Sequence, residues 1–266
     1  MDPFKIYNPT APEVPIIVSV PHCGTAFPED IKREYISSLT EAPDDTDWFV
    51  DKLYDFAPSM GMTLITANYS RWIIDLNRDP DSKPLYSDGR IITALCPTTT
   101  FLGEPLYIDK RQTVEDAEVK RRYTLYYKPY HEKIQSLLDS LKAKFGKVLL
   151  WDCHSIRQIV PTIQKDKFPD LILGDADERS ASPEIIQTAI NSLSSAQWKV
   201  SHNQPFKGGT ITRAFGKPSL RQHALQLEMP KVNYMDDTET KYSEARAEQV
   251  RNLLRKTFDQ LISQLR

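Results

Sequence analysis

The sequence predicts an α/β fold of three layers, α/β/α, in which helices cover both faces of a mostly parallel central sheet. Short apolar, β-branched runs alternate along the chain with amphipathic segments, which is the order of strands and helices in βαβ units. Several of these runs end abruptly in polar residues, as buried parallel strands do. The 266 residues contain no internal repeat, low-complexity segment or dividing linker, so we expect a single domain over 1–266.

In the first half of the chain, residues 15–22 (PIIVSVPH) predict a buried strand that ends in a polar pair. Residues 44–61 predict a helix, because apolar side chains recur there at helical spacing. Residues 62–78 supply further extended runs. The stretches 79–90 and 95–107 are rich in proline, glycine and polar residues, so we expect long loops there, of the kind that line functional sites.

The second half opens with a predicted helix over about 114–145, in which Pro129 indicates a break or kink and Gly146 a C-cap. Further apolar runs predict strands at 147–154, 170–175, 198–203 and 224–229. Amphipathic segments predict helices at 183–194 and 240–265. Strands and helices thus alternate to the end of the chain, as a sheet covered on both faces requires.

The composition gives no reason to expect nucleic acid or a membrane as partner. The formal net charge is −2, and lysine and arginine are scattered along the chain. No apolar run approaches the roughly 18 residues that span a bilayer, and the first residues do not resemble a secretory signal. Three cysteines are too few for a disulfide scaffold. We therefore expect a soluble, cytoplasmic protein.

Polar side chains that suit one site follow several of the predicted strands. His22, His154 and Glu228 each stand at the end of a strand, and Asn77 and Arg78 end a further extended run. Ligands bind beyond the carboxyl ends of the strands in such sheets. Two histidines and a carboxylate are a plausible zinc set that leaves the fourth position to water. A bound zinc ion would lower the pKa of that water to about 7.

The acidic ligand of such a site is open between Asp45, Asp47 and Glu29, and the two aspartates could equally cap a helix. Glu228 ends a later strand, which suits a general base. A buried, unpaired carboxylate in that position would be costly without a function. The residues alone therefore favour a metal site but leave its third ligand undecided.

Three arginines are candidate clamps for a carboxylate substrate, because a guanidinium can bind a carboxylate through two parallel hydrogen bonds. They are Arg71, Arg78 and Arg213. Gly208 and Gly209 would let a backbone come close to a ligand. Arg78 could instead form an ordinary surface ion pair. Among the other histidines, His202 is a weaker site candidate, and we interpret His131 and His223 as structural or surface residues.

A thiol mechanism is the alternative chemistry, because Cys23 and Cys153 each adjoin a histidine. Side chains alternate along a strand, so Cys153 should face away from Asp152 and His154. We therefore expect Cys153 to be a buried, small apolar residue.

Several long blocks of the sequence resemble a known family. The blocks are SVPHCGT, DDTDWFVDKLYDFA, YSRWIIDLNRDPDSKPLY, LCPTTTF, LLWDCHSIR, FKGGTITRAFG and HALQLEMPKVNYMDD. From about residue 15 to about residue 240 the chain is similar to the N-formylglutamate amidohydrolases, also called N-formylglutamate deformylases. The resemblance implies a phosphorylase/hydrolase-like fold similar to that of zinc carboxypeptidases. It also implies a metal-dependent hydrolase that converts N-formyl-L-glutamate and water into formate and L-glutamate, a step of histidine degradation.

Carried over to this sequence, the resemblance implies that His22, His154 and an acidic residue bind zinc. Asp47 of DTDW is our choice for that residue and Asp45 the reserve, because Thr25 stands where the short His-x-x-Glu spacing of the carboxypeptidases would place a glutamate. One zinc ion is expected, with another divalent metal as the alternative. The resemblance further implies that Asn77 and Arg78 bind the substrate carboxylate.

The mechanism we expect from the resemblance assigns the proton transfers to Glu228. Arg71 would stabilise the oxyanion together with zinc. Arg213, behind Gly208 and Gly209, would bind the side-chain carboxylate of a small dicarboxylate substrate, and Asp152 would support His154. Two alternatives stay open: the same mechanism on another N-acyl amino acid or short peptide, and a binding protein that keeps the pocket without turnover. The sequence does not predict an oligomeric state.

Overall fold

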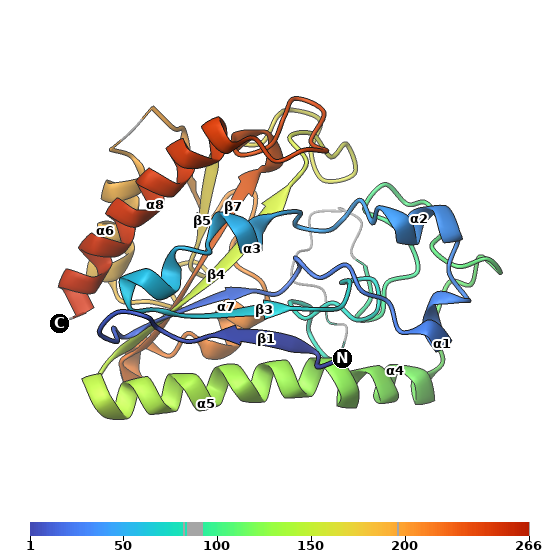
Figure 1. Ribbon diagram of the computed structural model, residues 1–266, viewed down its shortest axis with the longest axis horizontal. Helices are drawn as coiled ribbons and strands as arrows, with labels where there is room; N and C mark the ends of the chain where they lie inside the picture. Colours follow the sequence, from blue (N-terminus) through green and yellow to red (C-terminus); the bar gives the residue numbers. More distant parts are fainter. Residues whose placement is uncertain (82, 84–92, 196, 266) are drawn as a thin grey trace.

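One mixed sheet runs through the molecule in the order β1-β3-β2-β4-β7-β5-β6. The computed structural model describes residues 1–81, 83, 93–195 and 197–265 (Figure 1). The strands are β1 (Phe4–Tyr7), β2 (Ile16–Val20), β3 (Thr63–Ala67), β4 (Val148–Ile156), β5 (Leu171–Gly174), β6 (Val200–His202) and β7 (Gln222–Pro230).

The sheet is mostly parallel, as the sequence predicts. Strands β3, β2, β4 and β7 run parallel to one another, while β1 is antiparallel to β3. The β5–β6 pair is parallel internally but runs antiparallel to β7. The carboxyl ends of β2, β3, β4 and β7 therefore meet at one edge of the sheet, and β5 and β6 end at the opposite edge.

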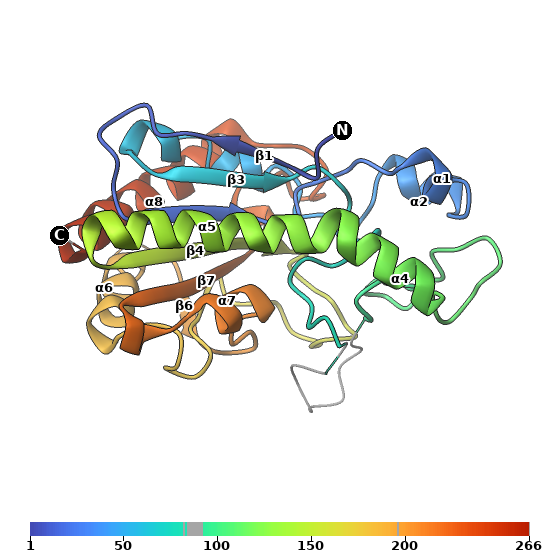
Figure 2. The ribbon, with the colours of Figure 1, turned by 90° about the horizontal axis from the view of Figure 1, so that it is seen from below.

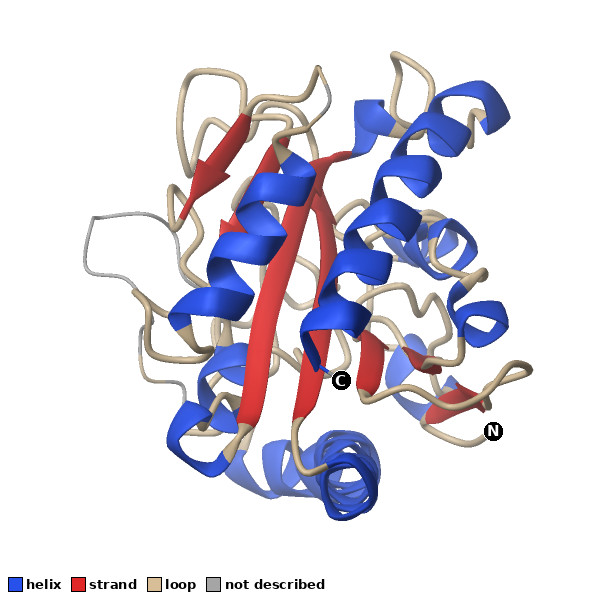
Figure 3. Cartoon of the chain, turned by 90° about the vertical axis from the view of Figure 1, so that its left-hand side faces the viewer, coloured by secondary structure: helices blue, strands red, loops and turns tan. Residues whose placement is uncertain are grey.

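Helices cover both faces of this sheet, which confirms the predicted three-layer α/β architecture. The longer helices are α4 (Asp116–Arg122), α5 (Lys128–Phe145), α6 (Pro183–Leu193), α7 (Thr210–Phe215) and α8 (Glu244–Leu265). Shorter helical segments are α1 (Glu29–Lys32), α2 (Ser37–Glu41), α3 (Val50–Leu53), η1 (Ala57–Met60), η2 (Tyr123–Tyr127), η3 (Pro218–Leu220) and η4 (Lys231–Asn233). Figure 2 shows α5 running along the sheet, and Figure 3 shows the strands between the two helix layers.

Alternation along the strands divides the core between the two faces. Ile16 and Val18 of β2 join a cluster with α3, α6 and α8, whereas Ile17 joins a second cluster with α5 and α7. All nine residues of β4 are buried, and so are all nine of β7. Strands buried on both faces need no apolar–polar alternation, which is why consecutive residues such as Val148, Leu149 and Leu150 of β4 are all apolar.

The helix predicted over about 114–145 is confirmed, since α4, η2 and α5 together extend from Asp116 to Phe145. The break at Pro129 and the C-cap at Gly146 are also found. Gly146 has φ +78° and donates its N–H to Lys142 O at 2.8 Å, as a left-handed C-cap does. The break predicted at Pro129 is the π-helical segment η2, which immediately precedes α5. Because proline has no N–H and its ring crowds the preceding turn, regular α-helical bonding cannot pass through this position.

The predicted helix over 44–61 is wrong. Only α3 and η1 are helical there, because Phe49 adopts φ +62° and breaks the chain just before α3. Residues 71–78 are not an extended run either but a series of turns, in which Arg78 N–H binds Asp75 O at 3.1 Å. The sequence analysis also missed β1 and α7.

The predicted loops are confirmed where the structure describes them. Residues 95–107 contain neither helix nor regular strand, yet Leu106 and Tyr107 are buried. Of the loop predicted at 79–90, residues 82 and 84–90 lie outside the described residues. Among the residues described, no helix combines the length and the apolar character that crossing a bilayer demands.

Shortening a side chain in the centre of the sheet should cost stability. Ile17 is fully buried between β3 and β4 and packs toward α5, so I17A removes three carbon atoms from a closely packed core. We expect a loss of about 2–5 kcal/mol in the free energy of unfolding, measured by chemical denaturation. The matched control is I159A at an exposed position, which should change this free energy by less than about 0.5 kcal/mol. Equal effects of the two variants would contradict this description of the core.

Candidate metal centre

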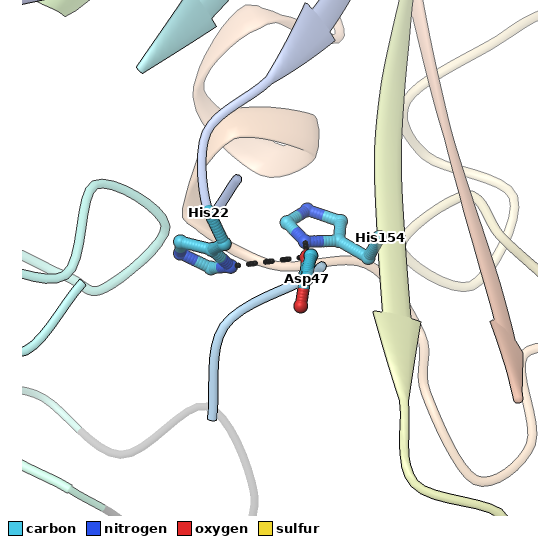
Figure 4. Close-up of side chains that lie close together, drawn as sticks. All are labelled: His22, Asp47 and His154. Atoms are coloured by element: carbon cyan, nitrogen blue, oxygen red, sulfur yellow. Dashed lines mark hydrogen bonds and ion pairs between the residues drawn. The ribbon is translucent and has the colours of Figure 1, made fainter. Parts of the chain in front are cut away.

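Three buried side chains converge at the edge where β2, β4 and β7 end. His22 follows β2, and His154 lies two residues before the end of β4. Asp47 comes from the turn before α3 (Figure 4). One donor atom from each lies within 4.8 Å of the other two. Asp47 N–H donates to His22 O at 3.0 Å, which ties the acidic residue to the end of β2.

The donor atoms of this group face one another. Asp47 Oδ2 lies 3.1 Å from His154 Nδ1 and 3.6 Å from His22 Nδ1. Among the described residues, His22 Nδ1 and Asp47 Oδ1 are buried and have no hydrogen-bond partner. Leaving such atoms unpaired is costly, so two of them within one buried group favour a ligand there. Imidazole nitrogen and carboxylate oxygen are ligands that zinc prefers, and the group can therefore hold a metal ion.

The opposite nitrogen of each histidine is held by a carboxylate. His22 Nε2 lies 2.8 Å from Asp75 Oδ1, and His154 Nε2 lies 3.1 Å from Asp152 Oδ2. A carboxylate that accepts a hydrogen bond from Nε2–H leaves the lone pair of Nδ1 free for a metal. Both rings are thus oriented as metal-binding histidines usually are.

The charges of this cluster stabilise one another. Burial alone would raise the pKa of the Asp47 carboxyl, but the hydrogen bond to His154 and the nearby His22 outweigh burial and hold the pKa below its ordinary value. For His154, burial would lower the pKa, but the charges of Asp152 and Asp47 outweigh it and raise the pKa well above its usual range. Without a metal, the cluster therefore favours a proton between these groups, which a metal ion would displace.

Asp75 links the histidine pair to two of the predicted arginines. Its Oδ2 accepts Arg71 Nη2 at 2.8 Å and lies 3.5 Å from Arg78 Nη2, while Oδ1 accepts the N–H of Asn77 at 2.9 Å. Burial would raise the pKa of the Asp75 carboxyl, but the charges of Arg71 and His22 hold it well below its ordinary value. Arg71 also lies over the Phe101 ring at 4.6 Å, and Arg78 Nε is buried without a partner among the described residues.

Glu228 lies beside His154 because the register of β4 and β7 pairs these two residues. Both side chains point to the same face of the sheet. Burial raises the pKa of the Glu228 carboxyl to about 8, with Asp47 adding to the shift and His154 opposing it. The structure thus brings together the carboxyl predicted as general base and one of the predicted metal ligands.

Asn77 is enclosed by protein partners rather than open toward a ligand. Its Nδ2 lies 2.9 Å from His154 Nε2 and 3.2 Å from Asp152 Oδ2, and its Oδ1 accepts the N–H of Ile211 at 2.8 Å. A Cβ atom at Gly209 would overlap the Asn77 amide. Gly209 is therefore needed for the close approach of α7 to Asn77. The N–H of Gly209 donates to Gln226 Oε1 at 2.8 Å.

Arg213 is not brought to this group within the described residues. It donates Nε–H to Gly208 O at 2.9 Å and lines a separate cavity with Ala176, Arg179, Ser180 and Gly216. His202 also lies apart, because β6 runs opposite to β7; its Nε2 is 2.6 Å from Asp175 Oδ2.

The other acidic candidates lie outside the metal group. Asp45 Oδ2 accepts Trp72 Nε1 at 2.9 Å and Phe101 N–H at 3.0 Å, so it fastens the turn to two neighbouring loops. Glu29 is exposed at the start of α1. Cys153 is fully buried in the core with α6 and α8, as expected, and burial raises the pKa of its thiol well above the ordinary value.

Sequence reasoning missed Asp75 and Gln226, which position His22 and Asn77. Both are polar residues inside segments that are otherwise apolar, WIIDLN and ALQLEM, and each stands two residues from a candidate site residue. In extended backbone, residues two apart point to one face of the strand. The spacing of Gln226 and Glu228 therefore indicated that Gln226 faces the site. Asp75 lies in a turn, where the same rule does not apply.

The two aspartates of this turn provide a matched test of the metal group. D47N removes one ligand charge from the converging atoms and should weaken Zn²⁺ binding by about 100-fold or more, measured by competition with a chromogenic chelator. D45N alters a carboxylate that, within the described residues, accepts hydrogen bonds from Trp72 and Phe101, so it should keep the affinity for Zn²⁺ while lowering thermal stability. A loss of affinity in D45N but not in D47N would reverse the assignment of the acidic ligand.

Comparisons with known proteins place the chain among related sequences. The family model described as N-formylglutamate amidohydrolase matches residues 14–235. The N-formylglutamate deformylase of Pseudomonas putida is 37% identical over 254 residues, covering 94% of this chain and 93% of the relative. That of Pseudomonas aeruginosa is 39% identical, with 94% and 93% of the two chains covered.

A solved structure extends the likeness to the whole fold. The N-formylglutamate amidohydrolase from Ralstonia eutropha JMP134 superposes with a TM-score of 0.80 at 25% identity, covering 100% of this chain and 98% of its own. A family model that spans most of the chain, two relatives above one-third identity and a matching architecture lead to one conclusion. This chain belongs to the N-formylglutamate amidohydrolase family.

Proposed function

We propose that this protein hydrolyses N-formyl-L-glutamate to formate and L-glutamate with the help of one bound zinc ion. The observation that carries the proposal is the buried group of His22, Asp47 and His154 with two unpaired donor atoms, next to the Glu228 carboxyl. The names of the Pseudomonas relatives support the substrate. Their similarity covers 94% of this chain.

His22 Nδ1, Asp47 and His154 Nδ1 would hold the ion, since these atoms converge while Asp75 and Asp152 occupy the opposite side of each ring. When bound there, zinc supplies Lewis-acid chemistry that activates water at neutral pH and polarises the formyl oxygen. Another divalent metal would serve the same ligands with different affinity.

The chain's own groups would carry the proton transfers and the developing charge. Glu228, beside His154, takes a proton from the attacking water and later delivers it to the nitrogen of the leaving amine. Arg71, oriented by Asp75 and by its position over Phe101, stabilises the negative charge that develops on the formyl oxygen.

Arg78 would bind the α-carboxylate of the substrate, and Asn77 would keep the neighbouring groups in place. Arg78 Nε has no partner among the described residues, and Nη2 donates to Thr93 Oγ1 at 2.9 Å, so the guanidinium retains donors for a ligand. The amide of Asn77 is already engaged, because its Nδ2 donates to Asp152 Oδ2 and its Oδ1 accepts the N–H of Ile211. We therefore revise the role of Asn77 from carboxylate binding to positioning of Asp152, which in turn orients His154.

We also propose a cytoplasmic location and a place in histidine degradation. The three cysteines are unpaired, which suits a reducing compartment. The place in histidine degradation rests on the family resemblance. A small dicarboxylate is the expected partner.

Formate release from N-formyl-L-glutamate is the direct test of the proposed function. The purified protein should release formate, lose this activity when a chelator removes its metal, and regain it with Zn²⁺. Ca²⁺, which prefers oxygen ligands, serves as the control and should not restore activity. A folded, zinc-loaded protein that releases no formate would refute the substrate, and full activity in metal-free protein would refute the role of the metal.

E228Q tests the assignment of the proton transfers. The amide is nearly the same size as the carboxyl but cannot accept the proton, so kcat should fall by about 10²–10⁴-fold. Zinc content should stay at the wild-type level, because Glu228 is not one of the converging ligands. E132Q, at an exposed position of α5, is the matched control. Wild-type turnover in E228Q would remove Glu228 from the mechanism.

A further inference from the structure

A small cavity lies directly beside the metal group. It is lined by Asp44, Asp45, Phe101, Leu102, Ser155, Ile156, Arg157, Val160 and Lys231. Its volume of about 10 Å³ is enough for one oxygen-sized group. The cavity was not expected from the sequence, because its walls come from loops far apart along the chain.

The walls of the cavity continue the segments that carry the site. Ser155 directly follows His154, and Lys231 follows Glu228 by three residues. Asp45 precedes Asp47 by two residues. Phe101, whose ring lies under Arg71, forms the side shared with the proposed oxyanion position. The charge of Asp47 also acts on Lys231, so this wall of the cavity lies near the metal group. We infer that a substrate whose formyl group lies at the metal group extends its side chain toward the cavity.

The acceptor groups of the cavity wall already have partners. The Asp44 carboxylate binds Arg157 Nε at 2.9 and 2.8 Å. The Asp45 carboxylate accepts hydrogen bonds from Trp72 and Phe101, and burial raises the pKa of this carboxyl although Trp72 and Arg71 oppose the rise. Ser155 Oγ accepts Tyr234 O–H at 2.8 Å. These pairings reduce the repulsion that the two carboxylates would exert on an anionic ligand.

Lys231 is a wall residue whose ammonium has one hydrogen-bond acceptor within the described residues. Its side chain is only 2% exposed, and its Nζ donates to Asp44 O at 2.9 Å. An ammonium group has three donors, and in the described part of the chain no carboxylate oxygen pairs with this one. Burial lowers the pKa of Lys231, while the charges of Asp47 and Asp44 oppose that shift. A buried cation with unused donors is costly unless a ligand compensates for it.

We propose that Lys231 binds the side-chain carboxylate of the N-formyl amino acid and so sets the preference of the site for an acidic side chain. This inference rests on the proposed hydrolase function. It assigns to Lys231 the role that the sequence suggested for Arg213, which lines a different cavity. One carboxylate oxygen would enter the cavity and accept the free N–H groups of Lys231, while the α-carboxylate stays with Arg78.

The test compares two substrates in two variants of the full-length, zinc-loaded protein. N-formyl-L-norvaline resembles N-formyl-L-glutamate in length but has no side-chain carboxylate. K231Q removes the positive charge of Lys231 but still offers an N–H donor to Asp44 O. The control is K165Q, which removes the charge of an exposed lysine. For K231Q we expect kcat/KM for N-formyl-L-glutamate to fall about 10- to 100-fold, while the value for the norvaline derivative changes by less than about threefold. K165Q should match the wild type on both substrates.

Equal losses on both substrates in K231Q, with normal zinc content, would overturn the assignment and leave the hydrolase function intact. If K231Q does not fold, the wild type still decides: equal kcat/KM for the two substrates would show that no side-chain carboxylate is recognised. Absence of turnover of N-formyl-L-glutamate by the wild type would instead refute the proposed function itself.

Discussion

The buried carboxylate of Asp75 is the interaction on which the site depends. It binds His22 Nε2 and Arg71 Nη2, each at 2.8 Å, and accepts the N–H of Asn77. A buried charge is stable only while its hydrogen-bond and ion-pair partners stay in place. The Asp75 carboxylate therefore fixes the positions of His22, Arg71 and Asn77 together. The pairing leaves His22 Nδ1 facing Asp47 and holds Arg71 beside the metal group. One carboxylate thus connects a metal ligand with a group proposed to act on the substrate.

The parallel pairing of β4 with β7 provides the second constraint. Leu150 and Ala224 pair deep in the core, whereas His154 and Glu228 pair near the carboxyl ends. The same two strands therefore supply apolar packing along most of their length and chemistry at one end. Asp152 and Gln226, also paired, form the transition between these regions and hold His154 and Asn77. The site residues are buried where they adjoin this closely packed core, which limits how far their side chains can move.

The acidic ligand shows where sequence reasoning reaches its limit. Asp45 and Asp47 stand two residues apart in one polar run, and local pattern treats them alike. The predicted helix over 44–61 would have turned them in different directions from those observed. In the structure, Phe49 at φ +62° ends the turn, and Asp47 N–H binds His22 O. These features orient Asp47 toward the histidines and Asp45 toward Trp72, and both depend on contacts with distant segments.

Local sequence patterns were enough to locate most strands and the long helices, because burial and backbone periodicity are encoded within a few neighbouring residues. The same patterns identified His22, His154 and Glu228 as polar residues at strand ends. The family resemblance was also visible in the chain alone. The direction of the strands could not be read from the sequence, because only long-range pairing makes β5 and β6 run opposite to β7. This direction separates His202 from the metal group. The positions of Arg213 and Lys231 likewise became clear only in the folded chain, because they follow from how distant loops pack together.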